Sequence, residues 1–157
     1  MELDYRTIHM DLGVSGSYFG VGKTLGPVKT VMDSDGKVQS GMIHSLTVMV
    51  SGSSFNDDLN FIFSESASAA GVVGSTYSPT FADLKTVLGV VSSTGSIGSN
   101  STVSVGGHAI ATFRNLDIPF NCDSLFLASV FNGEQTASFG SGSMWATIGY
   151  ELGQSRN

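Results

Sequence analysis

Hydrophobic residues recur at every second position over short segments, and this period of two is the feature that most restricts the fold of the chain. Leu46, Val48 and Val50 alternate with Thr47 and Met49. Near the end of the chain the same pattern places five residues on one face: Met144, Ala146, Ile148, Tyr150 and Leu152. Successive side chains of a β-strand point to opposite faces, so the alternation predicts strands with one buried face.

Two further segments have the length of strands. Residues 59–64 alternate, with Leu59, Phe61 and Phe63 on one face. The segment from Leu125 to Phe131 is apolar on both faces. Because strands that are apolar on both sides are typical of a sheet covered on both sides, we predict that this segment is a central strand.

Turn signals divide the chain into these short segments. Asp33-Ser34-Asp35-Gly36 is a hairpin-type signal, since glycine accepts a positive φ. Residues 64–76 and 92–102 are small and polar, which predicts surface loops. Many short strands separated by frequent turns predict an all-β fold, an antiparallel β-sandwich or jelly-roll-like architecture.

One segment, residues 79–88, departs from the β pattern and predicts one short helix over an end of the sandwich. Its apolar residues have the i, i+3, i+7 spacing of one helix face: Phe81, Leu84 and Leu88. Ser78 or Thr80 is available as the N-cap, and Gly89 is expected to end the helix.

The chain has the length of one domain, 157 residues, and no linker divides it. Within that domain we distinguish residues 1–40, an N-terminal arm with the first strands, from residues 41–157, the core of the β-sandwich. The N-terminal region is rich in glycine and has weak strand patterning, which is typical of an arm that becomes ordered on a partner.

Charged residues are scarce, at 13% of the chain against about 25% in an average protein, and the net charge is −6. The surface must therefore be built mainly from Ser, Thr, Gly and Asn, and such groups cost less to bury at an interface than unpaired charges. The few cations are scattered, so we expect neither nucleic acid nor a membrane as a partner. No signal peptide or transmembrane run is visible, and we expect synthesis in a cytoplasm.

Motifs for catalysis or cofactor binding are incomplete. Gly20-Val21-Gly22-Lys23-Thr24 resembles a phosphate loop, but Ser17 stands where that motif needs its first glycine. No nucleophile and base pair is visible, so we predict that the chain is not an enzyme and has no cofactor.

Metal ligands are also sparse. The histidines lie far apart without ligand spacing: His9, His44 and His108. Asp33 with Asp35, or Asp57 with Asp58, leaves a calcium site open as an alternative, although the downstream glutamate of a calcium loop is missing. We predict no metal site, and we interpret Cys122 as a buried apolar residue.

The block from Gly41 to Val48 has the pattern "Gly-x-Ile-x-Ser-Leu-x-Val", and Leu116 to Pro119 has the pattern "Leu-x-Ile/Leu-Pro". These patterns resemble a strand and a corner in a family of small head-decoration (capsid cement) proteins of tailed bacteriophages. The matched blocks follow in order along the chain: Gly41 to Val48, Asp58 to Phe63, Asp83 to Val91, Asn115 to Phe120 and Ser124 to Ala128. The first 40 residues have no counterpart in the family.

This resemblance implies a structural virion protein on the outer capsid surface. It implies the major capsid protein and further copies of the chain as partners, with a homotrimer suited to three-fold positions of the lattice. It supplies no catalytic residues. We expect the capsid and subunit contacts in the region from Leu12 to Thr30, in the loop from Ser64 to Thr80 and at one exposed aromatic residue. The candidate contact residues are Val14, Tyr18, Phe19, Val21, Leu25, Val28, Tyr77 and Trp145.

A rival hypothesis is a carbohydrate- or receptor-binding β-sandwich of a phage tail or fibre. Such a module needs exposed aromatic side chains on which sugar rings stack. The aromatic candidates for this role are Tyr5, Tyr18, Tyr77, Trp145 and Tyr150.

Overall fold

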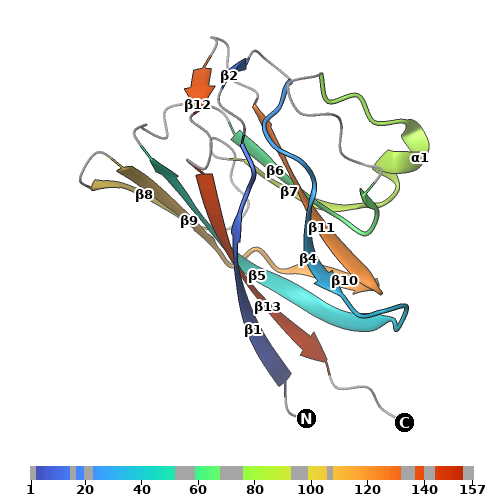
Figure 1. Cartoon of the computed structure of the whole chain (residues 1–157). Coiled ribbons are helices and arrows are strands. Elements are labelled where there is room, and N and C mark those ends of the chain that lie inside the picture. Colours follow the sequence, from blue (N-terminus) through green and yellow to red (C-terminus); the bar gives the residue numbers. More distant parts are fainter. Residues whose placement is uncertain are drawn as a thin grey trace.

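The computed structural model describes residues 3–14, 17–19, 23–51, 59–67, 76–92, 99–105, 108–131, 137–139 and 144–153. Most of these residues form antiparallel strands in two main sheets that face each other (Figure 1). The predicted all-β sandwich with a short helix is therefore confirmed.

The larger sheet has six strands, with β1, β13, β5, β9 and β8 side by side and β10 paired to one end of β5. Their bounds are β1 Leu3–Asp11, β5 Gln39–Ser51, β8 Ser99–Val105, β9 His108–Arg114, β10 Ile118–Cys122 and β13 Met144–Gly153. Strands β5 and β13 are the long centre of this sheet and pair from Met144↔Val50 to Leu152↔Gly41.

The smaller sheet has five strands, in the order β3, β11, β6 and β7, with β4 also paired to β11. Their bounds are β3 Lys23–Thr24, β4 Lys29–Asp33, β6 Leu59–Ser64, β7 Val87–Ser92 and β11 Ser124–Phe131. A separate pair joins β2, Ser17–Phe19, to β12, Ala137–Phe139. The apolar segment predicted to be central is β11, which has strands on both sides.

The core lies between the two main sheets and contains the faces that the alternation predicted. Leu46, Val48 and Val50 of β5 are buried, and so are the five alternating residues of β13. Phe61 and Phe63 of β6 are fully buried opposite them. A second, smaller cluster lies on the other side of β6 and β11, where Tyr77 and Val87 pack against Ile62, Ala128 and Val130.

Residues of the predicted arm contribute to this core. Strand β1 pairs with β13 along its whole length, while β3 and β4 pair with β11. Leu12, Val14 and Leu25 have exposed fractions of 1% or less. Residues 3–33 therefore supply strands and buried side chains to both layers of the sandwich.

The turn signal at Asp33–Gly36 was identified correctly, but it does not make a hairpin. Asp35 and Gly36 both have positive φ, and Asp33 Oδ1 accepts a hydrogen bond from the Asp35 amide at 3.0 Å. The strands on either side of it, β4 and β5, belong to different sheets. The turn carries the chain from one layer to the other because β4 finds its partner in β11.

The helix is shorter than predicted. Helix α1 spans Phe81–Leu84, and Leu88 lies on β7 instead of on a helical face. Thr80 is the N-cap and forms a capping box with Asp83, at 3.1 Å in each direction. The predicted loop 92–102 also differs, because β8 begins at Ser99. The loop prediction at 64–76 falls largely on residues outside the described ranges.

Candidate functional site

The outward surface of the larger sheet, which we call the outer face, is assembled in rows across four strands. Pairing places Asp11 of β1 beside Trp145 of β13, Trp145 beside Met49 of β5, and Met49 beside Ile110 of β9. Trp145 and Met49 are exposed by 44% and 38%, and Ile110 is partly exposed. Paired residues of an antiparallel sheet share a face, so these side chains form one apolar row with Asp11 at its end.

The next row of the outer face is polar and internally hydrogen-bonded. His9, Thr147, Thr47 and Thr112 are successive partners on the same four strands. His9 Nδ1 lies 2.8 Å from Thr147 Oγ1, and Thr47 Oγ1 lies 3.3 Å from Thr112 Oγ1. These contacts hold the hydroxyl groups of Thr147, Thr47 and Thr112 in place beside the apolar row.

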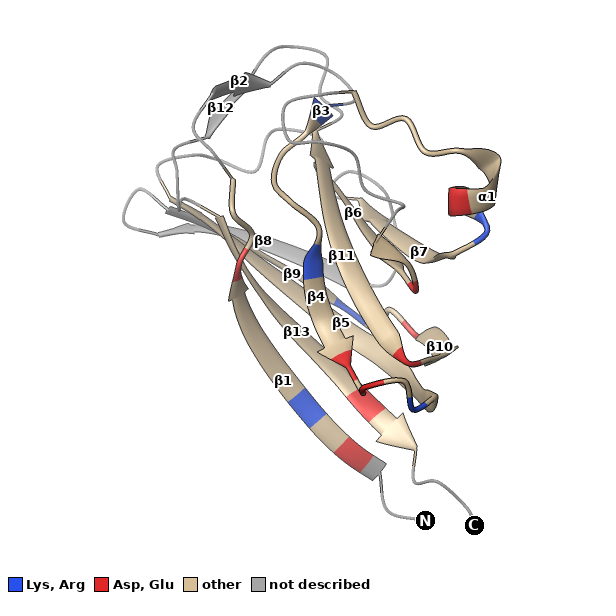
Figure 2. Ribbon diagram, turned by 45° about the vertical axis from the view of Figure 1, so that its right-hand side comes forward, with Lys and Arg blue, Asp and Glu red and all other residues tan. Residues whose placement is uncertain are grey.

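A third row carries the smallest side chains. Gly149 pairs with Thr7 on one side and with Ser45 on the other. A Cβ atom on Gly149 would lie 2.6 Å from Ser45 Oγ, so a larger residue there would require the Ser45 hydroxyl to move. Charges on the outer face are confined to its margins, and Figure 2 shows how few acidic and basic residues the described strands carry.

One corner of the outer face gathers groups that can titrate. His44 Nε2 lies 3.2 Å from Glu151 Oε1 without the alignment of a hydrogen bond, and His44 Nδ1 lies 3.9 Å from Asp117 Oδ1. The Tyr5 ring stands 6.2 Å from the imidazole, measured between ring centroids. The Leu116 amide donates to the His44 carbonyl oxygen at 3.0 Å and holds the loop that carries Asp117. A protonated His44 would be attracted to both carboxylates.

A second exposed surface lies on the side of the smaller sheet, around α1, and we call it the α1 patch: Tyr77, Phe81, Leu84 and Lys85. Phe81 and Leu84 are exposed by 75% and 48%. Lys85 Nζ lies 5.1 Å from the Phe81 ring centroid. Tyr77 is half-buried against Ile62, Ala128 and Val130, and this burial, with the nearby charge of Asp83, raises the pKa of its hydroxyl. The capped turn therefore holds two large apolar side chains in solvent instead of in the core.

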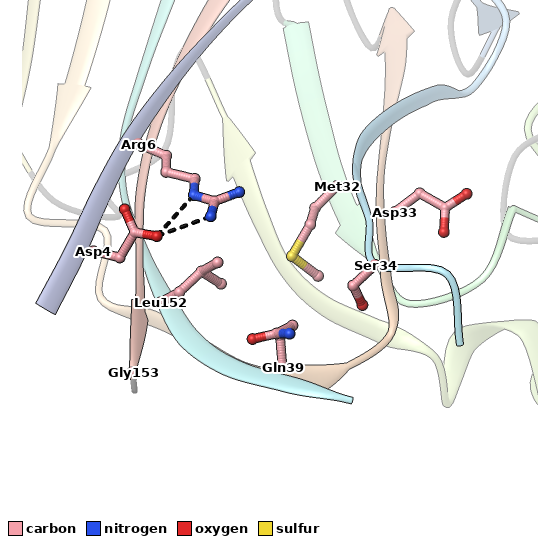
Figure 3. A pocket seen from close by; sticks show the side chains of 8 residues that line it. All are labelled: Asp4, Arg6, Met32, Asp33, Ser34, Gln39, Leu152 and Gly153. Carbon is pink, nitrogen blue, oxygen red and sulfur yellow. Dashed lines mark hydrogen bonds and ion pairs between the residues drawn. The ribbon is translucent and has the colours of Figure 1, made fainter. Parts of the chain in front are cut away.

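A pocket of about 330 Å³ opens where the ends of β1 and β13 face β4 and the start of β5 (Figure 3). Arg6 donates from Nε and Nη2 to the same Asp4 oxygen, at 3.1 and 2.8 Å. Met32 and Leu152 supply apolar walls, with Asp33 across the opening. Its hydrogen bonds and charge attraction to Asp4 raise the pKa of Arg6.

The predicted contact residues do not gather at one place. Val14 and Leu25 are buried in the core, and Val28 is partly buried. Tyr18 and Phe19 lie on β2, where the structure describes only the backbone pairing, and Val21 lies outside the described residues. Tyr77 belongs to the α1 patch and Trp145 to the outer face, on different sheets.

Sequence reasoning missed the main exposed pairs. The helical spacing predicts a shared helix face for Phe81 and Leu84 but not their exposure, and the alternation places Met49 opposite Leu46 and Val48 without marking it as a contact residue. The signal for Met49 and Trp145 was present, because both occupy the outward positions of strands whose alternate residues are buried. No comparable signal marks the α1 patch, since helical spacing of apolar residues normally indicates burial.

Within the described ranges, no cluster of three or more His, Cys, Asp or Glu side chains could hold a metal ion. Asp33 and Asp35 form the turn described above, whereas Asp57 and Asp58 lie outside the described residues. Cys122 is buried as predicted, and that burial raises the pKa of its thiol. No described helix is long and apolar enough to span a bilayer.

Comparisons with known proteins find structural likeness alone. No protein-family model matches the chain, and no curated protein matches it. Among solved structures, it is similar to a chain in the structure of infectious bursal disease virus, Gx strain, with a TM-score of 0.40 and 11% identity. The match covers 98% of this chain and 34% of the viral chain, so this chain spans about a third of that chain's length.

Proposed function

We propose that the chain is a structural virion protein, a decoration or cement protein that binds the outer surface of a tailed-phage head as a symmetric homo-oligomer. The observation that carries the proposal is the α1 patch. Phe81 and Leu84 stand in solvent on a capped turn, and large apolar side chains exposed side by side are typical of contact sites. We assign this patch to the contact with the major capsid protein.

The order of the strands supports the same proposal. The blocks that resemble the phage decoration family lie, in sequence order, on β5, on β6, on α1 with β7, and on β10 with β11. In the corner block, Leu116 and Ile118 are buried while Pro119 is exposed on β10, which pairs with β5 alone among the described strands. Proline is tolerated in such an edge strand because it has no amide hydrogen to donate. The resembling blocks are thus parts of one connected framework.

A cement protein needs no covalent chemistry. It binds the assembled shell more tightly than it binds free capsid subunits, and this difference shifts the equilibrium toward the intact head. Contacts repeated over a lattice add avidity, so each one can be weak. The scarcity of charge suits this role, because Ser, Thr and Gly surfaces lose little solvation when they are covered. A trimer would match three-fold positions on the shell.

The test is co-sedimentation with heads that lack the protein, prepared from the phage that encodes it. The double variant Phe81→Ser/Leu84→Ser should lose at least about tenfold in head binding, since buried apolar anchors dominate such contacts. Val38→Ser is the matched control, because Val38 is 66% exposed but lies on the connection between β4 and β5. Equal binding of wild type and the double variant would refute the assignment of the α1 patch. Absence of wild-type binding would refute the decoration role.

The carbohydrate-binding alternative has one observation in its favour. Trp145 is 44% exposed beside Asp11, with the His9 and Thr147 pair in the adjacent row. An aromatic face next to hydroxyl and carboxylate groups is a chemistry that sugars bind. A glycan array with wild type and Trp145→Ser separates the two functions, because only the alternative predicts a Trp145-dependent glycan signal in the absence of capsids.

A further inference from the structure

The outer face has two properties that suit a self-complementary surface: an apolar row along one edge, and opposite charges at opposite corners. Asp11 lies on β1 at the end of the apolar row. Arg114 lies on β9, three strands away, and is exposed on the outward side because Phe113 beside it is buried. From strand spacing and rise, the two Cα atoms are roughly 20 Å apart across the face.

We propose that the outer face packs against the same face of a second copy of this chain. Consider a two-fold axis that lies in the plane of the interface, passes through the middle of the face and is perpendicular to the line from Asp11 to Arg114. This axis brings Asp11 of each copy to Arg114 of the other, so the dimer contains two such pairs. This line runs diagonally across the strands, so the two sheets would cross at close to a right angle, one of the two preferred arrangements for packed sheets. Trp145 and Met49 of each copy would then be covered near the axis.

The placement of charges on the outer face favours a second copy of this chain over an unrelated partner. The chain carries a net charge of −6, so two copies repel each other in most orientations. The outer face avoids this repulsion because it offers one acid and one base where the copies would meet, with threonines and apolar groups between them. Glu151 lies at the margin and already has His44 beside it. The contact therefore buries no pair of like charges.

The size of the face sets the expected strength of the contact. Four strands over about seven residues give roughly 500 Å² of level surface. This area is smaller than the ~800 Å² per partner of a standard stable interface, so we expect a reversible dimer with a Kd on the order of 10 µM. The contact does not depend on the proposed capsid role. On a lattice, it would join neighbouring molecules or pair two trimers through their outer faces.

Trp145 is the only tryptophan of the chain, so it reports on this face alone. Sedimentation equilibrium should give a monomer–dimer equilibrium, and Trp145 emission should shift to the blue as the concentration rises and the ring loses water. Trp145→Ser should weaken the dimer at least about tenfold, whereas Val38→Ser should leave it unchanged. A protein that is monomeric up to about 1 mM overturns the proposal. Emission that responds to glycans but not to protein concentration overturns it also.

A double-mutant cycle tests the orientation of the two copies. Asp11→Asn keeps the side-chain oxygen that accepts the Gly13 amide at 2.8 Å, so the local turn is retained while the charge is removed. Arg114→Gln removes the opposite charge. Within one chain these sites are too far apart to interact, and their effects on dimerisation would be additive. If they meet across the interface, each variant weakens the dimer about fivefold and the double variant is little worse than either single variant. Additive effects in a protein that does dimerise overturn the proposed pairing.

Discussion

Replacing Gly41 with alanine tests how closely β5 approaches its neighbours. Gly41 pairs with Leu152 of β13 on one side and with Phe120 of β10 on the other. A Cβ atom at this position would overlap with the carbonyl oxygen of Glu151 and lie 2.5 Å from Phe120 Cζ. Because Cβ atoms essentially never come within 3.0 Å of such atoms, the strands would have to separate.

The cost can be worked from these contacts. Moving β5 away from β13 by about an ångström weakens two backbone hydrogen bonds, each worth about 1 kcal/mol. Displacing the Phe120 ring from its packed position adds about 1 kcal/mol. We therefore expect Gly41→Ala to lower the free energy of unfolding by about 3 kcal/mol. In a domain of this size, that loss corresponds to a fall in Tm of about 6–12 °C.

Gly153→Ala is the matched control, because Gly153 is on the neighbouring strand and the nearest atom to its Cβ would be Ser40 O at an ordinary 3.5 Å. This change should alter the free energy of unfolding by less than about 0.5 kcal/mol. Urea unfolding followed by Trp145 fluorescence and by far-UV circular dichroism measures both variants. A difference of less than about 1 kcal/mol between them would refute the reasoning, since it would mean that β5 and β13 can separate freely.

The remaining predictions concern the core, the helix cap and the thiol. Phe63→Ala should cost about 3–5 kcal/mol in urea unfolding, because this fully buried ring fills space between the sheets. Thr80→Ala should cost about 1 kcal/mol by removing the capping box and should weaken head binding, whereas Ser78→Ala should do neither. Cys122 should alkylate far more slowly than glutathione at pH 8, because burial, with the nearby charges of Glu65 and Asp123, raises the pKa of its thiol and leaves little thiolate. The alkylation rate of Cys122 should keep rising at pH values where the rate of glutathione has become constant. Equal alkylation rates of Cys122 and glutathione at pH 8 would contradict the burial of the thiol.

Much of the candidate site was visible in the sequence without being recognised as a site. The alternation in β13 placed Trp145 opposite the buried residues, and its side chain is 44% exposed. The same rule applied to β5 would have marked Met49 as exposed. What the pattern could not supply was the pairing that brings these two residues, with Ile110, into one row. Pairing partners lie tens of residues apart, and strand register is decided by the whole sheet.

In the N-terminal region, the sequence pattern gave an expectation that the structure does not bear out. Weak patterning and many glycines suggested an arm that orders on a partner, but Leu12, Val14 and Leu25 are buried within the chain itself. The sequence offered little sign of this because short strands and connecting residues carry too few positions to show a period. A residue such as Gly26, whose Cβ would clash with the backbone of Leu12 and Gly13, acts through close approach, which is invisible in the sequence.

The sequence by itself determined the class of fold, the faces of the long strands and the position of the turn at Asp33–Gly36, because these follow from local side-chain alternation and from the backbone freedom of single residues. Only the tertiary structure decided that the turn at Asp33–Gly36 joins two sheets, that Phe81 and Leu84 face solvent, and that the outer face forms one continuous surface. These features depend on which distant strands pair and on which surfaces the layers leave uncovered. That choice is made by the burial of the whole core, and no single segment encodes it.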